Sequence, residues 1–161
     1  LMTGASVTLA ICIAAFTIFQ FRNQPTCTSR WSADFLDQRL APGDRILFTS
    51  LSRAPVQHYS KRVAAASQSF PIQIDSHAGY EPNYSRMKAE GTLNEEAAVT
   101  VSSLAREGVR RVWLVHGFRP VVSDSITKAL PLSYRKQESE SFQCSGIPCY
   151  HNRLDLYVLQ P

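Results

Sequence analysis

The stretch TLNEEAAVTVSSLAREGVRRVWLVHG, residues 92–117, decides the fold class because a helix is followed directly by a buried strand. Thr92 to Glu95 has the form of a capping box, and Gly108 is suited to end the helix. The apolar positions between them recur at helical spacing: Ala97, Ala98, Val101, Leu104 and Ala105. Residues 112–115 (VWLV) are continuously apolar, which is typical of a strand that is buried on both faces.

The same alternation of strands and helices extends in both directions. We expect strands at Arg45–Thr49, Pro71–Asp75 and Leu154–Leu159, with another near Phe142. We expect helices at Thr26–Leu40, with Trp31, Phe35, Leu36 and Leu40 on one face, from Pro55 to Val63, and from a Ser123 cap to Leu130. This order predicts an α/β fold: a small Rossmann-like sandwich with a mainly parallel sheet, closed by a C-terminal antiparallel hairpin.

Residues 76–91 show no helical or strand period, so we expect an irregular loop there. Three of its side chains suit ligand contacts: the aromatic rings of Tyr80 and Tyr84 suit a sugar, and the guanidinium of Arg86 suits a phosphate. These three residues are candidates for binding, together with His116 at a strand end.

Polar residues follow the predicted strands at Thr49-Ser50, at Asp75-Ser76-His77 and at His116-Gly117. In an open α/β sheet the ligand crevice lies beyond the carboxyl ends of the strands, so these residues are placed for binding. The alternative is that they are ordinary polar surface loops.

The N-terminal run Leu1–Phe21 contains no charged side chain and is long enough to cross a bilayer as a helix. We therefore expect a transmembrane helix at 1–21, a linker at 22–28 and a globular domain at 29–161. A secretory signal sequence and a buried helix of a soluble protein are the alternatives. Because the chain begins with Leu1 inside the apolar run, we expect it to be a piece of a longer polypeptide.

The charged residues argue against a nucleic-acid partner. The 17 basic and 13 acidic residues give a net charge of +4, but they are scattered and mixed rather than gathered on one stripe. We therefore expect a solvated basic surface and no nucleic-acid partner.

The cysteines allow several interpretations. Cys144 and Cys149 flank the turn Ser-Gly-Ile-Pro, which can bring two strand ends within reach of a disulfide. Free thiols are the second reading. Zinc, with His151 nearby, is the third, although four ligands are not evident, so we expect no metal.

No complete catalytic or cofactor motif is present. GxGxxG, a Walker loop, HExxH and paired CxxC motifs are all absent, and we expect no cofactor. Residues 112–118 look like the strand and His-Gly turn beside the oxyanion hole of α/β-hydrolases, but no G-x-S-x-G follows. His116 is therefore interpreted as a strand-end residue, and no catalytic residue is assigned.

Read together, several pieces resemble the C-terminal end of multi-spanning glycosyltransferases, similar to the dolichyl-phosphate-mannose protein mannosyltransferase group (glycosyltransferase family 39). They are an apolar helix, a Trp-containing helix at 31–40, the segment Pro42-Gly43-Asp44-Arg45-Ile46-Leu47 and the strand at 110–115. The resemblance implies a last membrane helix before a small extracytoplasmic α/β domain. It also implies a polyprenyl-phosphate sugar donor and catalytic acids in an upstream loop, which this chain does not contain.

We therefore expect the chain to lie in the cell membrane with its C-terminal domain outside the cytoplasm, as the accessory part of a glycosyltransferase. Its partners would be the bilayer, a polyprenyl-phosphate sugar and an acceptor. The main alternative is a single-pass anchored binding or interaction domain without catalysis.

Overall fold

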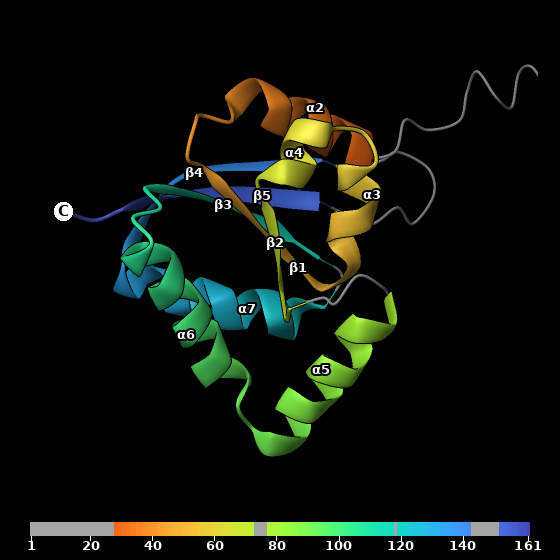
Figure 1. Cartoon of the computed structure of the whole chain (residues 1–161), viewed down its shortest axis with the longest axis vertical. Helices are drawn as coiled ribbons and strands as arrows, with labels where there is room; N and C mark the ends of the chain where they lie inside the picture. The colour runs from red at the N-terminus through yellow and green to blue at the C-terminus, as the bar shows by residue number, and fades with distance from the viewer. Residues whose placement is uncertain (1–27, 73–76, 118, 143–151) are drawn as a thin grey trace, which may run out of the picture.

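The computed structural model describes residues 28–72, 77–117, 119–142 and 152–161 (Figure 1). They form one five-stranded sheet in the order β2-β1-β3-β5-β4. The strands are β1 (Arg45–Thr49), β2 (Ser67–Phe70), β3 (Arg111–His116), β4 (Tyr134–Phe142) and β5 (Asn152–Leu159). The helices are α2 (Thr28–Arg39), α3 (Arg53–Gln57), α4 (Lys61–Ala65), α5 (His77–Glu90), α6 (Leu93–Arg106) and α7 (Pro120–Ala129). Short 3₁₀ turns lie at η1 (Ser50–Ser52) and η2 (Leu130–Leu132).

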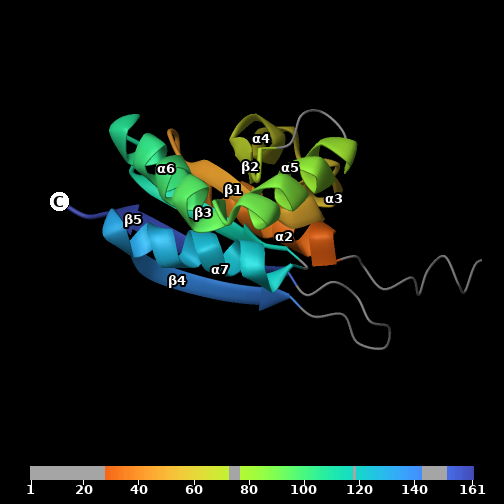
Figure 2. The ribbon, with the colours of Figure 1, turned by 90° about the horizontal axis from the view of Figure 1, so that it is seen from below.

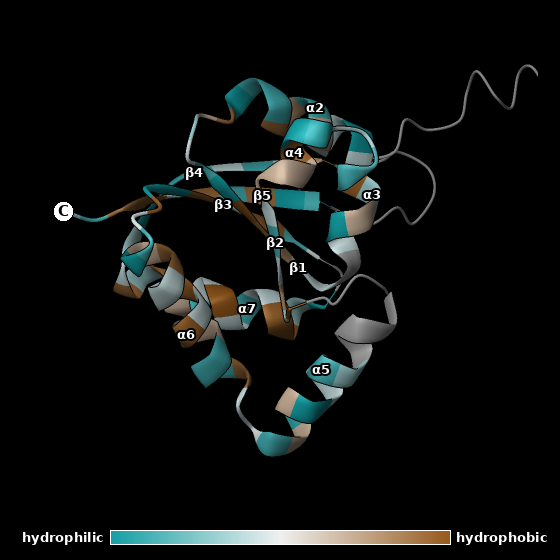
Figure 3. Ribbon diagram, viewed as in Figure 1, coloured by the Kyte–Doolittle hydropathy of each residue, from teal (hydrophilic) through white to brown (hydrophobic). Residues whose placement is uncertain are grey.

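The sheet separates two layers of helices. Helices α2, α3 and α4 cover one face, and α5, α6 and α7 cover the other, toward which Figure 2 looks. The two faces have separate cores, because Val112 and Leu114 of β3 point toward α6 and α7, whereas Trp113 and Val115 point toward α2. Figure 3 shows the hydrophobic residues along β3 and on parts of α6 and α7. The predicted buried strand at 112–115 is confirmed.

The sheet is mixed rather than mainly parallel. Strand β1 pairs in parallel with both β2 and β3, whereas β5 pairs antiparallel with both β3 and β4. The α/β class and the antiparallel C-terminal pair are confirmed, and the parallel prediction holds only for the β2-β1-β3 half.

Strand β2 differs from the prediction, which placed it at residues 71–75. It runs from Ser67 to Phe70 and ends before Pro71. Proline has no N–H to donate to a ladder, so it stops the strand instead of starting it. The buried Phe70 is the largest side chain that β2 contributes to the core.

Strand β4 is long and polar, although only a short strand near Phe142 was expected. Its burial pattern shows that most of its side chains are exposed. As the edge strand it covers little of the core, so its sequence carries no apolar alternation. Its first residue, Tyr134, is buried and donates a hydrogen bond from its hydroxyl to the carbonyl oxygen of Val109 at 2.9 Å.

The loop predicted at 76–91 is wrong, because α5 occupies residues 77–90. The helix carries Pro82 in its interior and lacks an apolar stripe, which explains why periodicity missed it. It is held to the core by Tyr84 and Met87, which are 8% and 4% exposed.

Two predicted helix caps are also corrected. Thr92 precedes α6 but makes no capping bond, and its hydroxyl instead donates to Glu96 at 3.1 Å rather than taking part in a box with Glu95. Ser123 does not begin α7, because Pro120 fills the first turn and Ser123 lies inside the helix.

The helix predicted after Pro55 is two short helices. Ser60 separates α3 from α4 and caps α4 by accepting from the backbone N–H of Val63 at 3.1 Å. Val56 and Val63 are buried as expected, whereas Tyr59 is 46% exposed. Leu36 of α2 and Leu40, which directly follows the helix, are buried, but Trp31 lies at the surface.

Several predictions fall on residues that the structure does not describe, namely the apolar run 1–21, residues 22–27 of the predicted linker and the Cys144–Cys149 pair, whereas Thr28, the predicted end of the linker, already belongs to α2. Among the residues that it does describe, no helix combines the length and the apolar character needed to cross a membrane.

Candidate functional site

The carboxyl ends of β1 and β3 meet at the point where the chain reverses direction across the sheet. From β1 the chain passes to β2 on one side, and β3 then pairs with β1 on the other side. This is a topological switch point, where open α/β sheets bind their ligands. Of the predicted edge residues, Thr49, Ser50, His116 and Gly117 come together here, whereas Asp75, Ser76 and the side chain of His77 lie outside the described residues.

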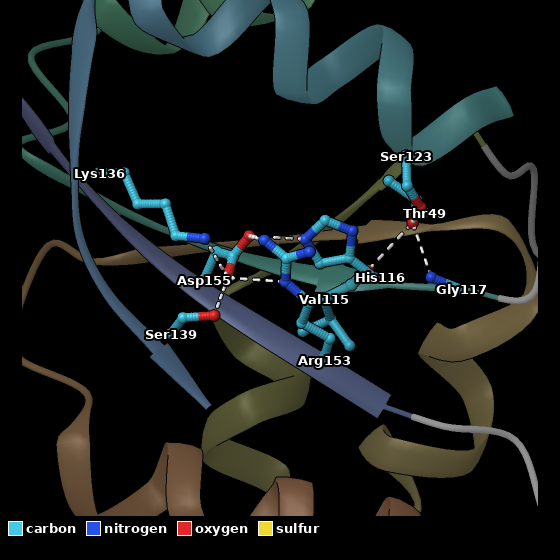
Figure 4. A network of polar contacts seen from close by, with 9 residues as sticks. All are labelled: Thr49, Val115, His116, Gly117, Ser123, Lys136, Ser139, Arg153 and Asp155. Carbon is cyan, nitrogen blue, oxygen red and sulfur yellow. Dashed lines mark hydrogen bonds and ion pairs between the residues drawn. The ribbon is translucent and has the colours of Figure 1, made fainter. Parts of the chain in front are cut away.

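A network of hydrogen bonds centred on Thr49 ties the two strand ends to α7 (Figure 4). The Thr49 hydroxyl accepts from the backbone N–H of Gly117 at 2.8 Å and lies 3.1 Å from the carbonyl oxygen of Val115. It also lies 2.7 Å from the hydroxyl of Ser123. Thr49 and Ser123 are both buried.

Replacing Thr49 by Val should lower the free energy of unfolding by about 1–3 kcal/mol, because the Gly117 N–H then loses its acceptor. Ser123→Ala removes a neighbouring hydroxyl but leaves that acceptor in place, so its cost should be smaller, about 1 kcal/mol. Urea unfolding of both variants measures the difference. Equal losses would contradict the bridging role of Thr49.

The second part of the site is a buried carboxylate surrounded by donors. Asp155 of β5 is 0% exposed. It accepts hydrogen bonds from four side chains that come from three neighbouring strands (Figure 4). They are His116 Nε2 at 2.9 Å, Ser139 Oγ at 2.6 Å, Lys136 Nζ at 2.9 Å and Arg153, through Nε at 3.1 Å and Nη2 at 2.9 Å. We call these five residues the Asp155 cluster.

The cluster keeps Asp155 ionised. Burial by itself would raise the pKa of a carboxyl group. The hydrogen bonds from His116, Ser139, Lys136 and Arg153 outweigh that effect and hold the pKa of Asp155 well below its usual range. Lys136 and Arg153 bring two positive charges against one negative charge, so the cluster carries an excess of positive charge.

Strand β4 presents opposite charges on its two faces. Lys136 and Ser139 face α7 and bond Asp155, whereas Glu138 faces α2, where Arg39 forms an ion pair with it at 3.2 Å. An irregularity in the pairing with β5 between Lys136 and Glu138 permits this arrangement. On the face covered by α7, the charged side chains that contact one another are therefore Lys136, Arg153 and the buried Asp155.

The four binding candidates do not form one site. Tyr84 is almost fully buried, and the guanidinium of Arg119 lies 4.5 Å from the centre of its ring. Arg86 pairs with Glu90 at 2.7 Å and with Glu96 at 3.0 Å, and both contacts raise its pKa. The side chain of Tyr80 lies outside the described residues. Only His116 lies in the Asp155 cluster.

One feature of the sequence does point to this cluster. Asp155 is the one charged residue in the otherwise apolar segment LDLYVL. A charged side chain in the middle of a strand that is buried on both faces requires hydrogen-bond or ion-pair partners. Lys136 and Arg153 gave no such signal, because they are ordinary polar residues in sequence. In the described part of the chain, no group of His, Cys, Asp and Glu side chains could hold a metal ion.

Comparison with known proteins gives no relative from which a function could be transferred: no protein-family profile matches the chain, and no similar sequence is found among curated proteins.

Proposed function

We propose that this chain is the last membrane helix and the accessory extracytoplasmic domain of an integral-membrane glycosyltransferase that uses a polyprenyl-phosphate sugar donor. The observation that supports this most is the position of the α/β domain. The first helix that the structure describes begins at Thr28, a few residues after the uncharged run 1–21. A helix of that composition and length suits a bilayer, and the domain would stand at its surface.

On this proposal the domain contacts a substrate, and the sugar transfer itself takes place elsewhere in the enzyme. The catalytic acids would lie upstream of Leu1. The switch-point edge and the Asp155 cluster supply hydrogen-bond donors and positive charge, which suit recognition of an anionic substrate.

A serine hydrolase is the less favoured candidate. Ser50 has φ of +58° at a turn from strand to helix, a position that resembles a nucleophile elbow, and His116 is bonded to a carboxylate nearby. However, Ser50 is 0% exposed, so a substrate could not reach its hydroxyl in this state. Labelling of Ser50 by a serine-reactive phosphonate would favour the hydrolase and contradict the accessory role.

The deciding experiment expresses the whole coding region around this chain in membranes and measures sugar transfer from a polyprenyl-phosphate donor. We expect transfer by the full polypeptide, and weaker but measurable transfer when the protein ends after residue 27. Full activity without residues 28–161 would contradict the accessory role. If no further apolar spans are encoded upstream and no transfer occurs, the single-pass anchored binding domain replaces the transferase.

A further inference from the structure

The Asp155 cluster has more donors than its carboxylate can use. A carboxylate offers about four lone-pair sites, and the bonds from His116, Ser139, Lys136 and Arg153 already fill them. Arg153 reaches Asp155 through Nε and Nη2 only, and Lys136 uses one ammonium N–H for the same carboxylate. The remaining N–H groups of both side chains have no protein acceptor in the described part of the chain.

These donors are held in place before any ligand arrives. Asp155 lies on β5, which is paired with β3 on one side and with β4 on the other. It accepts two hydrogen bonds from Arg153. A guanidinium that is fixed in this way loses little conformational entropy when it binds an anion. Asp155 therefore acts as a positioning residue for the cations around it.

The two cations are also accessible to solvent. The side chains of Arg153 and Lys136 are 50% and 38% exposed, whereas that of the neighbouring His116 is 15% exposed. His116 is the last residue of β3, so the cluster borders the switch-point edge. The acidic residue nearest to Lys136 on β4, Glu138, faces the opposite side of the sheet.

We propose that Arg153 and Lys136 form a binding site for a phosphate group, organised by Asp155. A phosphate oxygen can accept from the planar fork of Arg153, and a second oxygen can accept from the ammonium of Lys136. The site stands on the geometry of the cluster alone. The identity of its ligand as the phosphate of a polyprenyl-phosphate sugar rests on the function proposed above, and a free phosphate ester is the other source of the same chemistry.

The test measures how fast an amine-acylating reagent modifies Lys136 in the full chain reconstituted in phosphatidylcholine vesicles, with mass spectrometry as the readout. Lys61 of α4 is exposed on the other layer and serves as an internal control in the same molecules. Inorganic phosphate, exchanged for chloride at constant ionic strength, should slow acylation of Lys136 and leave Lys61 unchanged. Equal effects on both lysines, or no effect on either, would overturn the site.

A matched pair of variants tests the same site through stability. Bound phosphate should raise the melting temperature of the domain. Lys136→Gln should weaken phosphate binding about tenfold or more, the usual loss for one hydrogen bond to a charged group, whereas Lys61→Gln removes the same charge and should leave binding unchanged. Lys136→Arg should restore binding. If Lys136→Gln and Lys61→Gln respond alike, the proposal fails.

Lipid arms of the acylation experiment identify the source of the phosphate. Vesicles that contain polyprenyl phosphate should protect Lys136, and vesicles that contain neutral polyprenol should not. Protection by inorganic phosphate alone supports the site and assigns it to a soluble phosphate ester. These results are independent of the sugar-transfer assay, so the phosphate site can fail while the transferase stands, and the transferase can fail while the site stands.

Discussion

Replacement of Asp155 by Asn is expected to lower the free energy of unfolding by about 3 kcal/mol at pH 7. The carboxylate is fully buried and bonded to Lys136, Arg153, His116 and Ser139. Asn keeps the shape but removes the negative charge, which leaves two cations facing each other. The estimate is at the lower end for a broken buried ion pair, because Lys136 and Arg153 can turn toward water.

This effect should depend on pH in one direction. The pKa of Asp155 is lower in the folded protein than in the unfolded chain, where it is about 3.9. Its stabilising contribution is therefore complete above the unfolded pKa and is lost as the pH falls below about 4 toward the folded pKa. Urea unfolding should therefore show a large difference in the free energy of unfolding between wild type and Asp155→Asn at pH 7. At pH 3 the difference should be smaller.

Asp124→Asn is the matched control for this prediction. Asp124 is exposed on α7, so its replacement should change stability by no more than about 0.5 kcal/mol. A loss that is the same at both pH values, or the same in both variants, would contradict the role of the Asp155 carboxylate.

Gly117→Ala is the second change with a large expected effect. An ideal Cβ at residue 117 would lie 2.1 Å from the carbonyl oxygen of Thr49 and 2.7 Å from the Cβ of Ser50. Both obstacles belong to the neighbouring strand end rather than to a flexible side chain, so β1 and β3 would have to separate. We expect a loss of about 3 kcal/mol, at the upper end for an overpacked core, together with a weaker bond between the Gly117 N–H and Thr49.

Gly91→Asn provides the comparison. Gly91 has φ of +72°, which Asn tolerates, and nothing lies within 4 Å of its ideal Cβ. The free energy of unfolding of this variant should therefore be close to that of wild type.

Hydrogen exchange of the amide at residue 117 in Gly117→Ala should be faster than in wild type. Unchanged exchange would mean that the strand ends accommodate the methyl group.

The sequence predicted those helices and strands in which the pattern of apolar residues matches the side chains that are buried in the structure. Helix α6 and strand β3 are one example, because the apolar spacing of the helix and the apolar run of the strand match what each of them buries. Strand β4 was underestimated because an edge strand needs no apolar face, and α5 was missed because two core contacts, Tyr84 and Met87, hold it without a repeating pattern.

The candidate site was predicted only in part. The rule for open sheets located Thr49, His116 and Gly117 at one edge from local sequence alone. It could not find Lys136 or Arg153, because their relation to His116 depends on β5 inserting between β3 and β4. The order of the strands in the sheet depends on contacts between distant parts of the chain, and no local sequence pattern indicates it.

The place of β5 also has a consequence for biosynthesis. Among the described strands it comes last in sequence, yet it lies inside the sheet, with β3 on one side and β4 on the other. Until a ribosome has released residues 152–159, β3 and β4 have no partner between them, and the earlier strands can form only the parallel half. The sheet of this domain can therefore be completed only after residues 152–159 have left the ribosome, and a premature stop codon upstream of Asn152 would leave β3 and β4 with unpaired, aggregation-prone edges.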